Sequence, residues 1–300
     1  TLRPWDLAVD PHGHPPLKPF EDADELIEKT SKLFHRMDGE LGEMFDTMRD
    51  GGYSLDLDSR KGKAPGGYQA SRDRKRKPFI FMNAASLPRD LDTMVHEAGH
   101  AFHYMLCRHD DLVWYRGAPL EFAEVASMSM EMLSYPFLEE FYTSEETKRA
   151  IQKHLEGIVN FLPWCATIDA FQHWIYLNPD HTREERTGHW AELCKRFGSG
   201  VDWSGLEAEQ EAEWHRQLHL FQVPFYYIEY GIAQLGALQM WLHYSNDPEG
   251  ALASYKKGLA LGSSKPLPEL FENSGLKFDF TAQMVGTLMK AVEEALDQHA

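Results

Sequence analysis

Cysteine is scarce in this 300-residue sequence, which contains only Cys107, Cys165 and Cys194. Three scattered cysteines cannot build a disulfide framework, and no Cys-x-x-Cys pair is present to suggest a thiolate metal site. Because disulfides persist mainly in oxidising compartments, we expect reduced, buried thiols and a cytoplasmic protein.

Long apolar runs are also missing, since no stretch approaches the roughly 20 residues that span a bilayer. The first six residues, TLRPWD, show no basic-then-apolar signal pattern and no initiator Met. We therefore expect no membrane partner, and a chain that is either processed or a piece of something longer.

An excess of positive charge is absent, because the formal net charge is −17. Nucleic acid is therefore not expected as a partner, since phosphate binding requires a basic surface. One local exception lies between Arg60 and Lys77, where eight basic residues accompany the single acid Asp73. We interpret this stretch as a solvated loop or hairpin tip rather than a binding patch.

The spacing of apolar residues predicts a mainly α protein that forms a single domain over residues 1–300. A first helix is expected from about 22–24 to 49, and a small antiparallel sheet at about 53–83, with Pro78 to Asn83 as the best strand. Thr143 and Glu146 fit a capping box. The later helices are expected at 88–107, 119–134, 144–162, 165–177, 182–197, 206–218, 224–243, 248–261 and 281–298.

The segment from Val95 to His100 contains the pattern His-Glu-x-x-His within a helical stretch. Residues four apart lie on one face of a helix, so His96 and His100 can present two imidazoles to one zinc ion. Glu97 lies about 100° further round the helix, beside the metal, where it can take a proton from zinc-bound water. The alternative is a helix whose two histidines pair with nearby acids.

Gly99 lies inside this predicted helix, where glycine costs about 1 kcal/mol relative to alanine. Its presence makes sense if another backbone must come close to the helix at this point. The neighbouring apolar residues indicate that the two histidines line a buried cleft.

A catalytic zinc needs three protein ligands and one open position. The following apolar helix offers Glu121 and Glu124 as competing candidates, and the spacing alone gives Glu124 only a slight advantage. A solvated acidic face is the alternative for these glutamates.

Groups that orient the imidazoles are also expected. Asp92, one turn before His96, and Glu131, two turns after Glu124, are candidates, with ordinary surface acids as the alternative. We interpret His103 as a satisfied core or rim histidine rather than a ligand.

Donors that stabilise an oxyanion are expected beyond the metal. The segment from His219 to Tyr230 supplies a histidine and three tyrosines, Tyr226, Tyr227 and Tyr230. Their crowding favours a functional group over a purely structural aromatic stripe. The strand from Pro78 to Asn83 is expected to offer a sheet edge to which a substrate backbone can add.

These residues resemble the thimet oligopeptidase-like zinc peptidases, specifically the oligoendopeptidase F branch. The resemblance rests on HEAGHAFH at 96–103, FAEVAS at 122–127, PFYYIEY at 224–230 and Gly262-Ser263-Ser264 before LPEL, and it extends over most of the chain. It implies a helical zincin-like catalytic domain with a small sheet beside the zinc helix, and cytoplasmic enzymes that cut short peptides internally.

The resemblance also implies residue roles. It assigns one zinc ion to His96, His100 and Glu124, the general base to Glu97, and the groups that steady oxyanion and substrate to His219, Tyr227 and Tyr230, with Tyr226 still a candidate. Family members carry a helical segment ahead of this region that forms the opposite channel wall. We therefore expect the catalytic half of such an enzyme, able to contact that N-terminal region.

Three hypotheses follow for the function. The first is a zinc endopeptidase acting on short peptides, and the second is a carboxypeptidase-like exopeptidase that uses the same site. The third is a non-peptidase helical protein. A di-iron bundle would need Glu-x-x-His twice, but only Glu97 and His100 fit that pattern, which leaves a catalytically silent zinc-binding domain.

Overall fold

The computed structural model of the chain describes residues 1–52, 54–198 and 200–299, so residue 53, where the predicted sheet region begins, lies outside it. The chain divides into two compact units. One comprises Thr1–Pro16 and Leu155–Gly231, and the other comprises Leu17–His154 and the residues from Ile232 onward. One catalytic domain can contain two compact units, so the single domain over 1–300 stays a prediction.

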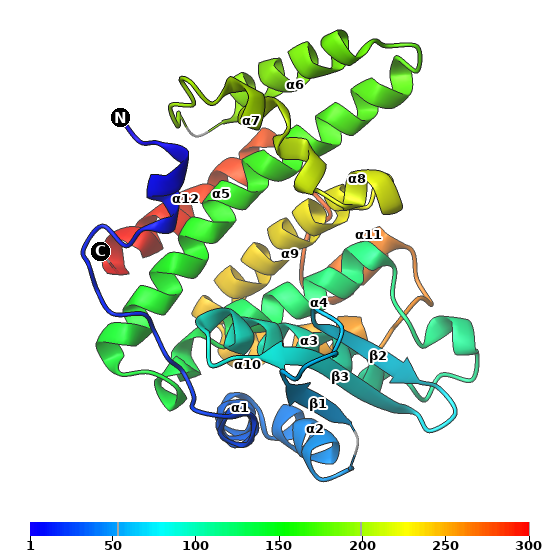
Figure 1. The fold of residues 1–300 in the computed structure, drawn as a ribbon. Coiled ribbons are helices and arrows are strands. Elements are labelled where there is room, and N and C mark those ends of the chain that lie inside the picture. The colour runs from blue at the N-terminus through cyan, green and yellow to red at the C-terminus, as the bar shows by residue number, and fades with distance from the viewer. Residues whose placement is uncertain (53, 199, 300) are drawn as a thin grey trace. The chain divides into compact units, whose positions relative to one another are not determined.

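The second unit contains the sheet and most of the helices (Figure 1). Its elements are α1 (Ala23–Met37), α2 (Gly39–Arg49), β1 (Leu55–Asp58), β2 (Tyr68–Arg72), β3 (Lys77–Ala84), α3 (Pro88–Cys107), η2 (Val113–Tyr115), α4 (Leu120–Leu133), η3 (Tyr135–Glu140), the start of α5 (Ser144–Leu177), most of α9 (Tyr227–Asn246), α10 (Pro248–Leu259), α11 (Leu267–Asn273) and α12 (Ala282–His299). The mainly α prediction is confirmed.

The first unit is helical in its described residues. It contains η1 (Pro4–Ala8), the rest of α5, α6 (Arg183–Phe197), α7 (Glu207–Glu211), η4 (Glu213–Arg216), α8 (His219–Gln222) and the first turn of α9. Its core is formed by Ile168, Phe171, Trp190 and Leu193.

The predicted first helix is divided at Asp38 into α1 and α2. The extended backbone of Asp38 ends α1, and its carboxylate accepts hydrogen bonds from the backbone N–H groups of Glu40 at 2.9 Å and Leu41 at 3.1 Å. These bonds satisfy donors at the start of α2, so Asp38 acts as an N-cap. Lys256 of α10 makes an ion pair with the same carboxylate at 2.8 Å. The apolar spacing continues across Asp38, which is why the pattern alone predicted one helix.

Several other helices begin or end at residues that differ from those predicted by the apolar periodicity. The helices predicted at 144–162 and 165–177 are one continuous α5, although Pro163 lies inside it. The helix predicted at 206–218 is replaced by α7 and η4, and the helix predicted from 224 begins at Tyr227. The capping box is confirmed, with Thr143 N–H donating to Glu146 at 3.0 Å and Glu146 N–H donating to Thr143 at 3.4 Å.

The sheet has the strand order β1-β3-β2 and is mixed, which corrects the prediction of a wholly antiparallel sheet. β2 and β3 form an antiparallel hairpin, whereas β1 pairs in parallel with β3. β1, the parallel partner of β3, precedes the β2–β3 hairpin in the chain. A hairpin signal in the sequence carries no information about a parallel pairing of this kind. The strand predicted at 78–83 is confirmed as β3, but it is the central strand, so the edges belong to β1 and β2.

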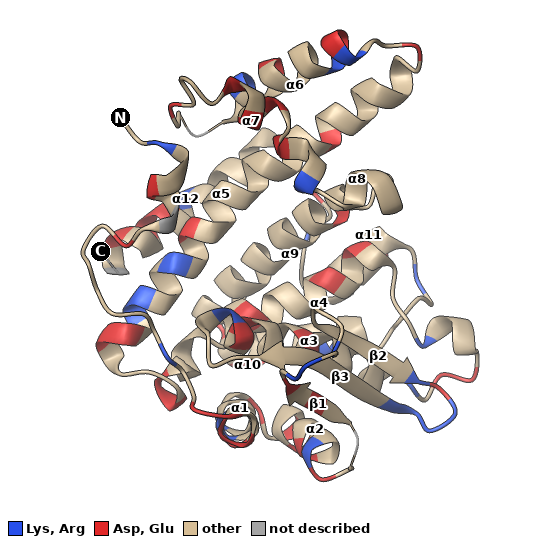
Figure 2. Cartoon of the chain, viewed as in Figure 1, with Lys and Arg blue, Asp and Glu red and all other residues tan. Residues whose placement is uncertain are grey.

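The second part of the basic stretch, from Arg72 to Lys77, forms the tip of the β2–β3 hairpin, where Figure 2 shows Lys and Arg gathered at the turn, whereas its first part lies in the loop after β1. Lys63 contradicts the prediction of a fully solvated stretch, because only 1% of its side chain is exposed. Its ammonium group donates to the backbone oxygens of Asp56 at 2.9 Å and Asp58 at 2.8 Å, and to the Asp56 carboxylate at 3.1 Å. Lys63 therefore fastens the loop after β1 instead of facing solvent.

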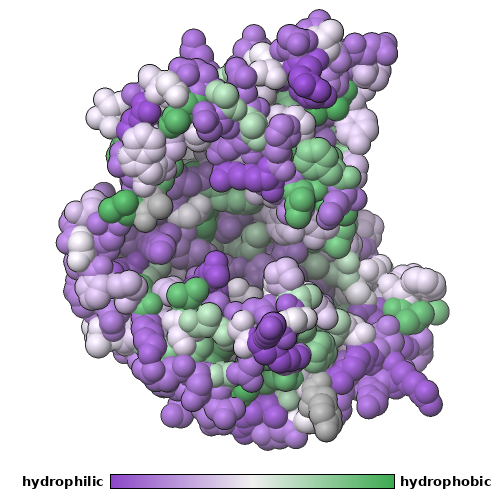
Figure 3. Space-filling view, viewed as in Figure 1, coloured by the Kyte–Doolittle hydropathy of each residue, from purple (hydrophilic) through white to green (hydrophobic). Residues whose placement is uncertain are grey.

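α3 and α4 pack against each other in the second unit, and they position the site. At the level of α1 and α2, the visible face of the molecule is largely hydrophilic (Figure 3), while Leu33, Phe34, Leu41 and Phe45 of these helices are fully buried.

In the part of the chain that the structure describes, no helix combines the length and apolar character of a membrane span.

Candidate metal centre

The two histidines of the His-Glu-x-x-His pattern lie on one face of α3, as the four-residue spacing predicts. Their rings meet edge to face with centroids 4.9 Å apart, and both side chains are largely buried. Burial and the neighbouring His96 lower the pKa of His100 to about 4, so its imidazole is neutral and free to donate a lone pair.

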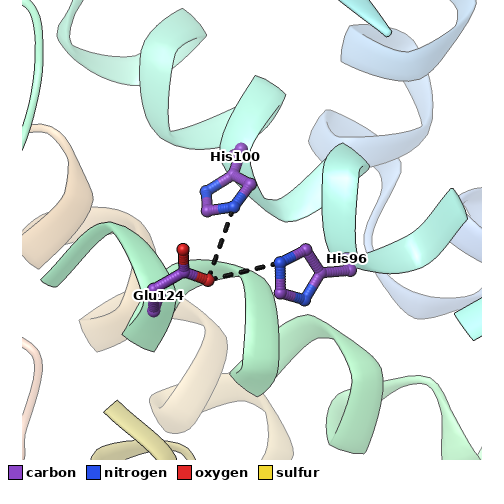
Figure 4. Close-up of side chains that lie close together, drawn as sticks. All are labelled: His96, His100 and Glu124. Carbon is purple, nitrogen blue, oxygen red and sulfur yellow. Dashed lines mark ion pairs between the residues drawn. The ribbon is translucent and has the colours of Figure 1, made fainter. Parts of the chain in front are cut away.

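Glu124 of α4 faces both imidazoles (Figure 4). Its Oε2 atom lies 3.3 Å from His96 Nε2 and 3.6 Å from His100 Nε2. Ligands bound tetrahedrally at about 2.0–2.2 Å are separated by roughly 3.3–3.6 Å, so these atoms fit the corners of one zinc coordination sphere. They form the group of ionisable side chains in the described residues that could hold a metal ion.

Gly99 lets α4 approach α3 closely enough to bring Glu124 into this position. A Cβ atom at Gly99 would lie 2.7 Å from Ser127 Cα and 2.8 Å from the Ala126 carbonyl oxygen. This confirms the expectation that another backbone passes at that point. Ser127 also donates its hydroxyl hydrogen to Glu124 Oε2 at 3.0 Å, which orients the carboxylate.

The competing candidates do not join this group. Glu121 lies on α4 one turn before Glu124, and it is not among the residues whose ligand atoms converge in the described chain. His103 is buried against the Phe122 ring, with centroids 5.7 Å apart. It is a core histidine as expected, but among the described residues its Nε2 atom has no hydrogen-bond partner, so the prediction of a satisfied side chain is wrong.

Glu97 lies beside the candidate ligands rather than among them. Its side chain is buried, and burial raises the pKa of its carboxyl group to about 7. Among the described residues, its Oε2 atom has no hydrogen-bond partner. Glu97 and His96 line one pocket together with Gly67, Arg89, Asp92, Thr93 and Glu131. An available buried carboxylate in such a pocket is suited to proton transfer.

Glu131 contacts a candidate ligand directly. Its Oε1 atom lies 2.5 Å from His96 Nδ1, and its Oε2 atom lies 2.9 Å from Nε2 of His154, which the sequence analysis did not identify. Burial raises the pKa of Glu131, but the hydrogen bonds from His154 and His96 outweigh burial and lower it to about 2. Asp92 was the other orienting candidate, but its side chain lines the pocket without a hydrogen bond or ion pair to His96 or to another described residue.

His219 and the three tyrosines gather in the first unit, around α8 and the start of α9. The ring centroid of His219 lies 5.9 Å from that of Tyr226, 5.0 Å from Tyr227 and 5.6 Å from Tyr230. Gln217 lies 2.6 Å from His219 Nδ1. Burial lowers the pKa of His219 and raises the pKa of Tyr227 to about 12, so both side chains are neutral at pH 7. The arrangement does not choose between Tyr226 and Tyr227.

Comparison with known proteins identifies relatives along most of the chain. The sequence profile of peptidase family M3 matches residues 32–289. Oligopeptidase PepF of Bacillus subtilis is 27% identical over 268 residues, which are 86% of this chain and 39% of the relative. An oligoendopeptidase F homolog of Borreliella burgdorferi is 26% identical, covering 84% of this chain and 42% of the relative.

Solved structures give the same result. The structure of PZ peptidase A with an inhibitor superposes with a TM-score of 0.90 at 33% identity, covering 99% of this chain and 53% of that one. An oligoendopeptidase F from Enterococcus faecium shares the fold, with a TM-score of 0.63 at 19% identity. The chain therefore spans about two fifths to one half of the length of these relatives.

Proposed function

The chain belongs to peptidase family M3, and from this premise we propose that it provides the zinc centre of an endopeptidase that hydrolyses short peptides. The observation that carries the proposal is the convergence of two imidazoles and one carboxylate, with ligand atoms all within 4.8 Å of one another, beside the buried carboxylate of Glu97.

Zinc is the metal that this donor set favours. Two histidines and a glutamate are a known ligand set for catalytic zinc, with a fourth position left open for water or substrate. In this proposal His96, His100 and Glu124 hold one zinc ion, which when bound supplies a Lewis acid and lowers the pKa of a coordinated water.

Glu97 is the general base of the proposed reaction. Its carboxylate accepts a proton from the attacking water and then passes that proton to the leaving amine nitrogen as the peptide C–N bond breaks. The buried position of Glu97 supports this role, because a base with a pKa near 7 can both take and return a proton near neutral pH.

His219, Tyr227 and Tyr230 are assigned to oxyanion and substrate stabilisation by their match to the family pattern. Their rings lie together, and neutral phenol and imidazole groups can donate hydrogen bonds to a developing negative charge. Tyr226 is retained as the alternative to Tyr227, since its ring is also close to His219.

The substrate backbone is proposed to add along β2 rather than along β3. β2 is an edge strand, and its residues Gln69 and Ser71 line a pocket that also contains His100. Main-chain hydrogen bonds to an exposed strand hold a peptide in extended form with little dependence on its sequence.

The decisive experiment replaces Glu97 with Gln. We expect Glu97→Gln to keep one zinc ion per chain, measured by metal analysis, and to lose cleavage of an internally quenched peptide by at least a thousandfold. Glu43→Gln on the exposed face of α2 is the matched control and should cleave at the wild-type rate. Retained turnover in the Glu97 variant would contradict its assignment as the base.

A second assay distinguishes internal cleavage from trimming. Peptides blocked at both ends should be cut as fast as free peptides if the enzyme is an endopeptidase. Strong dependence on a free carboxyl terminus would favour the carboxypeptidase-like alternative.

A further inference from the structure

We propose that Glu131, His154 and Tyr135 form a hydrogen-bonded chain that fixes the tautomer and ring orientation of His96, so that His154 and Tyr135 are positioning residues for the metal centre. This inference rests on the zinc site of the proposed function, and it concerns residues that the family pattern in the sequence did not bring forward.

The contacts run outward from the candidate ligand through three elements. His96 Nδ1 lies 2.5 Å from Glu131 Oε1, and the other oxygen of Glu131 lies 2.9 Å from His154 Nε2. Nδ1 of His154 lies 2.7 Å from the Tyr135 hydroxyl. Glu131 belongs to α4, Tyr135 to η3 and His154 to α5, so the chain joins the zinc helix α3 to three further elements.

The hydrogen-bonding capacity of each group sets the direction of the bonds. An ionised carboxylate can only accept, and each oxygen of Glu131 has an imidazole nitrogen within hydrogen-bond distance, so both imidazoles donate to it. In a neutral His154 the proton therefore sits on Nε2, and Nδ1 accepts the hydrogen of the Tyr135 hydroxyl. In a neutral His96 the proton likewise sits on Nδ1, so that Nε2, which faces Glu124, is the nitrogen left to carry the lone pair.

Nε2 of His96 is the nitrogen that faces the candidate metal position, because it lies 3.3 Å from Glu124 Oε2. A carboxylate that accepts from the other nitrogen raises the basicity of a ligand imidazole and fixes the orientation of its ring. Glu131 could rotate if it were held on one side only. His154 bonds its second oxygen, and Tyr135 in turn bonds the other ring nitrogen of His154, so the carboxylate is held in the plane that His96 needs.

The outer residues of this hydrogen-bonded chain, His154 and Tyr135, are held in place by packing. Tyr135 is 7% exposed, and its ring meets the rings of His154 and Trp241 edge to face, with centroids 5.6 Å and 6.4 Å apart. A buried chain in which every polar atom has a partner is rigid, whereas removing one member leaves a neighbour unsatisfied. Because the chain uses both ring nitrogens of His154, a side chain with one matching donor should replace it only in part.

Zinc affinity of the 300-residue protein, measured by competition with a chromophoric chelator, tests this proposal without reference to peptidase activity. We expect Glu131→Gln to weaken zinc binding by about 10- to 100-fold. His154→Ala should weaken it by about tenfold, and His154→Gln, which restores a donor toward Glu131, by less. Tyr135→Phe should weaken it severalfold, while Tyr142→Phe, at a buried tyrosine outside the hydrogen-bonded chain, should leave it unchanged.

The order of the effects separates positioning from general destabilisation. The visible spectrum of bound Co²⁺ should change in His154→Ala and return toward the wild-type spectrum in His154→Gln. Zinc affinity within twofold of wild type in both His154→Ala and Tyr135→Phe would overturn the proposal. If His154→Ala does not fold, the near-isosteric Tyr135→Phe still decides. Absence of zinc binding in the wild-type chain would instead refute the proposed function itself.

Discussion

Gly99 of α3 lies directly against the backbone of Ser127 in α4, where a Cβ atom would come within 2.7 Å of the Ser127 Cα atom. This contact is one turn from Glu124 and adjacent to His100. The distance between the two helices at this point determines whether the Glu124 carboxylate can share an ion with the two imidazoles. The glycine therefore contributes to the site through packing rather than through chemistry.

Gly99→Ala is expected to separate α3 from α4. The added methyl group meets backbone atoms that cannot move aside alone, so we expect a loss of about 1–3 kcal/mol in the free energy of unfolding and a clear loss of zinc affinity. Urea denaturation and chelator competition measure the two effects. Gly286→Ala is the matched control, because nothing lies within 4 Å of its Cβ position on α12. It should be neutral or slightly stabilising.

Zinc affinity should rise with pH. Burial lowers the pKa of His96, but its hydrogen bonds with Glu124 and Glu131 outweigh burial and raise the pKa well above the usual value. In the metal-free protein His96 therefore holds an extra proton, which zinc must displace from Nε2. We expect the association constant to increase by up to about tenfold per pH unit between pH 6 and 8. A flat profile in a non-coordinating buffer would contradict this competition.

Asp38 is expected to stabilise the junction of α1 and α2. Asp38→Ala removes the N-cap of α2 and the partner of Lys256, so a loss of about 1–2 kcal/mol in the free energy of unfolding is expected. Burial raises the pKa of Asp38, but hydrogen bonds from Lys256 and the backbone outweigh it and lower the pKa below 3.8. The stabilisation is thus present above about pH 4 and is lost as pH falls through the folded-state pKa.

Chemical denaturation of Asp38→Ala and wild type across the acid range measures this effect. The difference in stability should shrink in acid. Glu40→Ala removes only the exposed second partner of Lys256 and should change the stability by less than about 0.5 kcal/mol at neutral pH. An equal loss in both variants would show that the cap is not the important interaction.

Phe225 adopts a strained backbone just before the tyrosines of α9. Its φ of 63° lies in the left-handed region, and Tyr226 N–H donates to the Val223 carbonyl at 3.2 Å across the turn. Glycine is favoured there, because other residues pay about 1–2 kcal/mol for this conformation. We expect Phe225→Gly to be more stable than Phe225→Ala by about 1 kcal/mol, measured from urea midpoints. The reverse order would show that the turn relaxes on substitution.

Apolar periodicity and local motifs were sufficient to predict most of the helices of this molecule. α3 begins and ends at the predicted residues 88 and 107, because its pattern is strong and its start contains Pro88 at a favourable position. Periodicity failed at Asp38, where one capping carboxylate interrupts an otherwise continuous pattern, and at Pro163, where α5 tolerates the missing N–H. At both positions a single side chain or tertiary packing, rather than the apolar pattern, determines whether the helix ends or continues.

The sequence pattern could not predict contacts between segments that lie far apart in the chain. The parallel pairing of β1 with β3 depends on a crossover that leaves no local signal. His96 and His100 could be predicted as a pair because they share one helix face, whereas the spacing gave Glu124 only a slight advantage over Glu121 and the family resemblance made the choice. His154 could not, since its approach to Glu131 depends on how α5 packs against α4, and an isolated histidine in a long helix gives no sign of such a partner.

The most direct measurement of the central claim is a zinc titration of Glu124→Ala beside Glu121→Ala. The two glutamates lie one turn apart on α4, so the substitutions are matched in chemistry and in helix. If His96, His100 and Glu124 hold the ion together, Glu124→Ala should lose at least a hundredfold in zinc affinity, while Glu121→Ala should bind one zinc ion as tightly as wild type. Unchanged affinity in Glu124→Ala, or a loss confined to Glu121→Ala, would contradict the account.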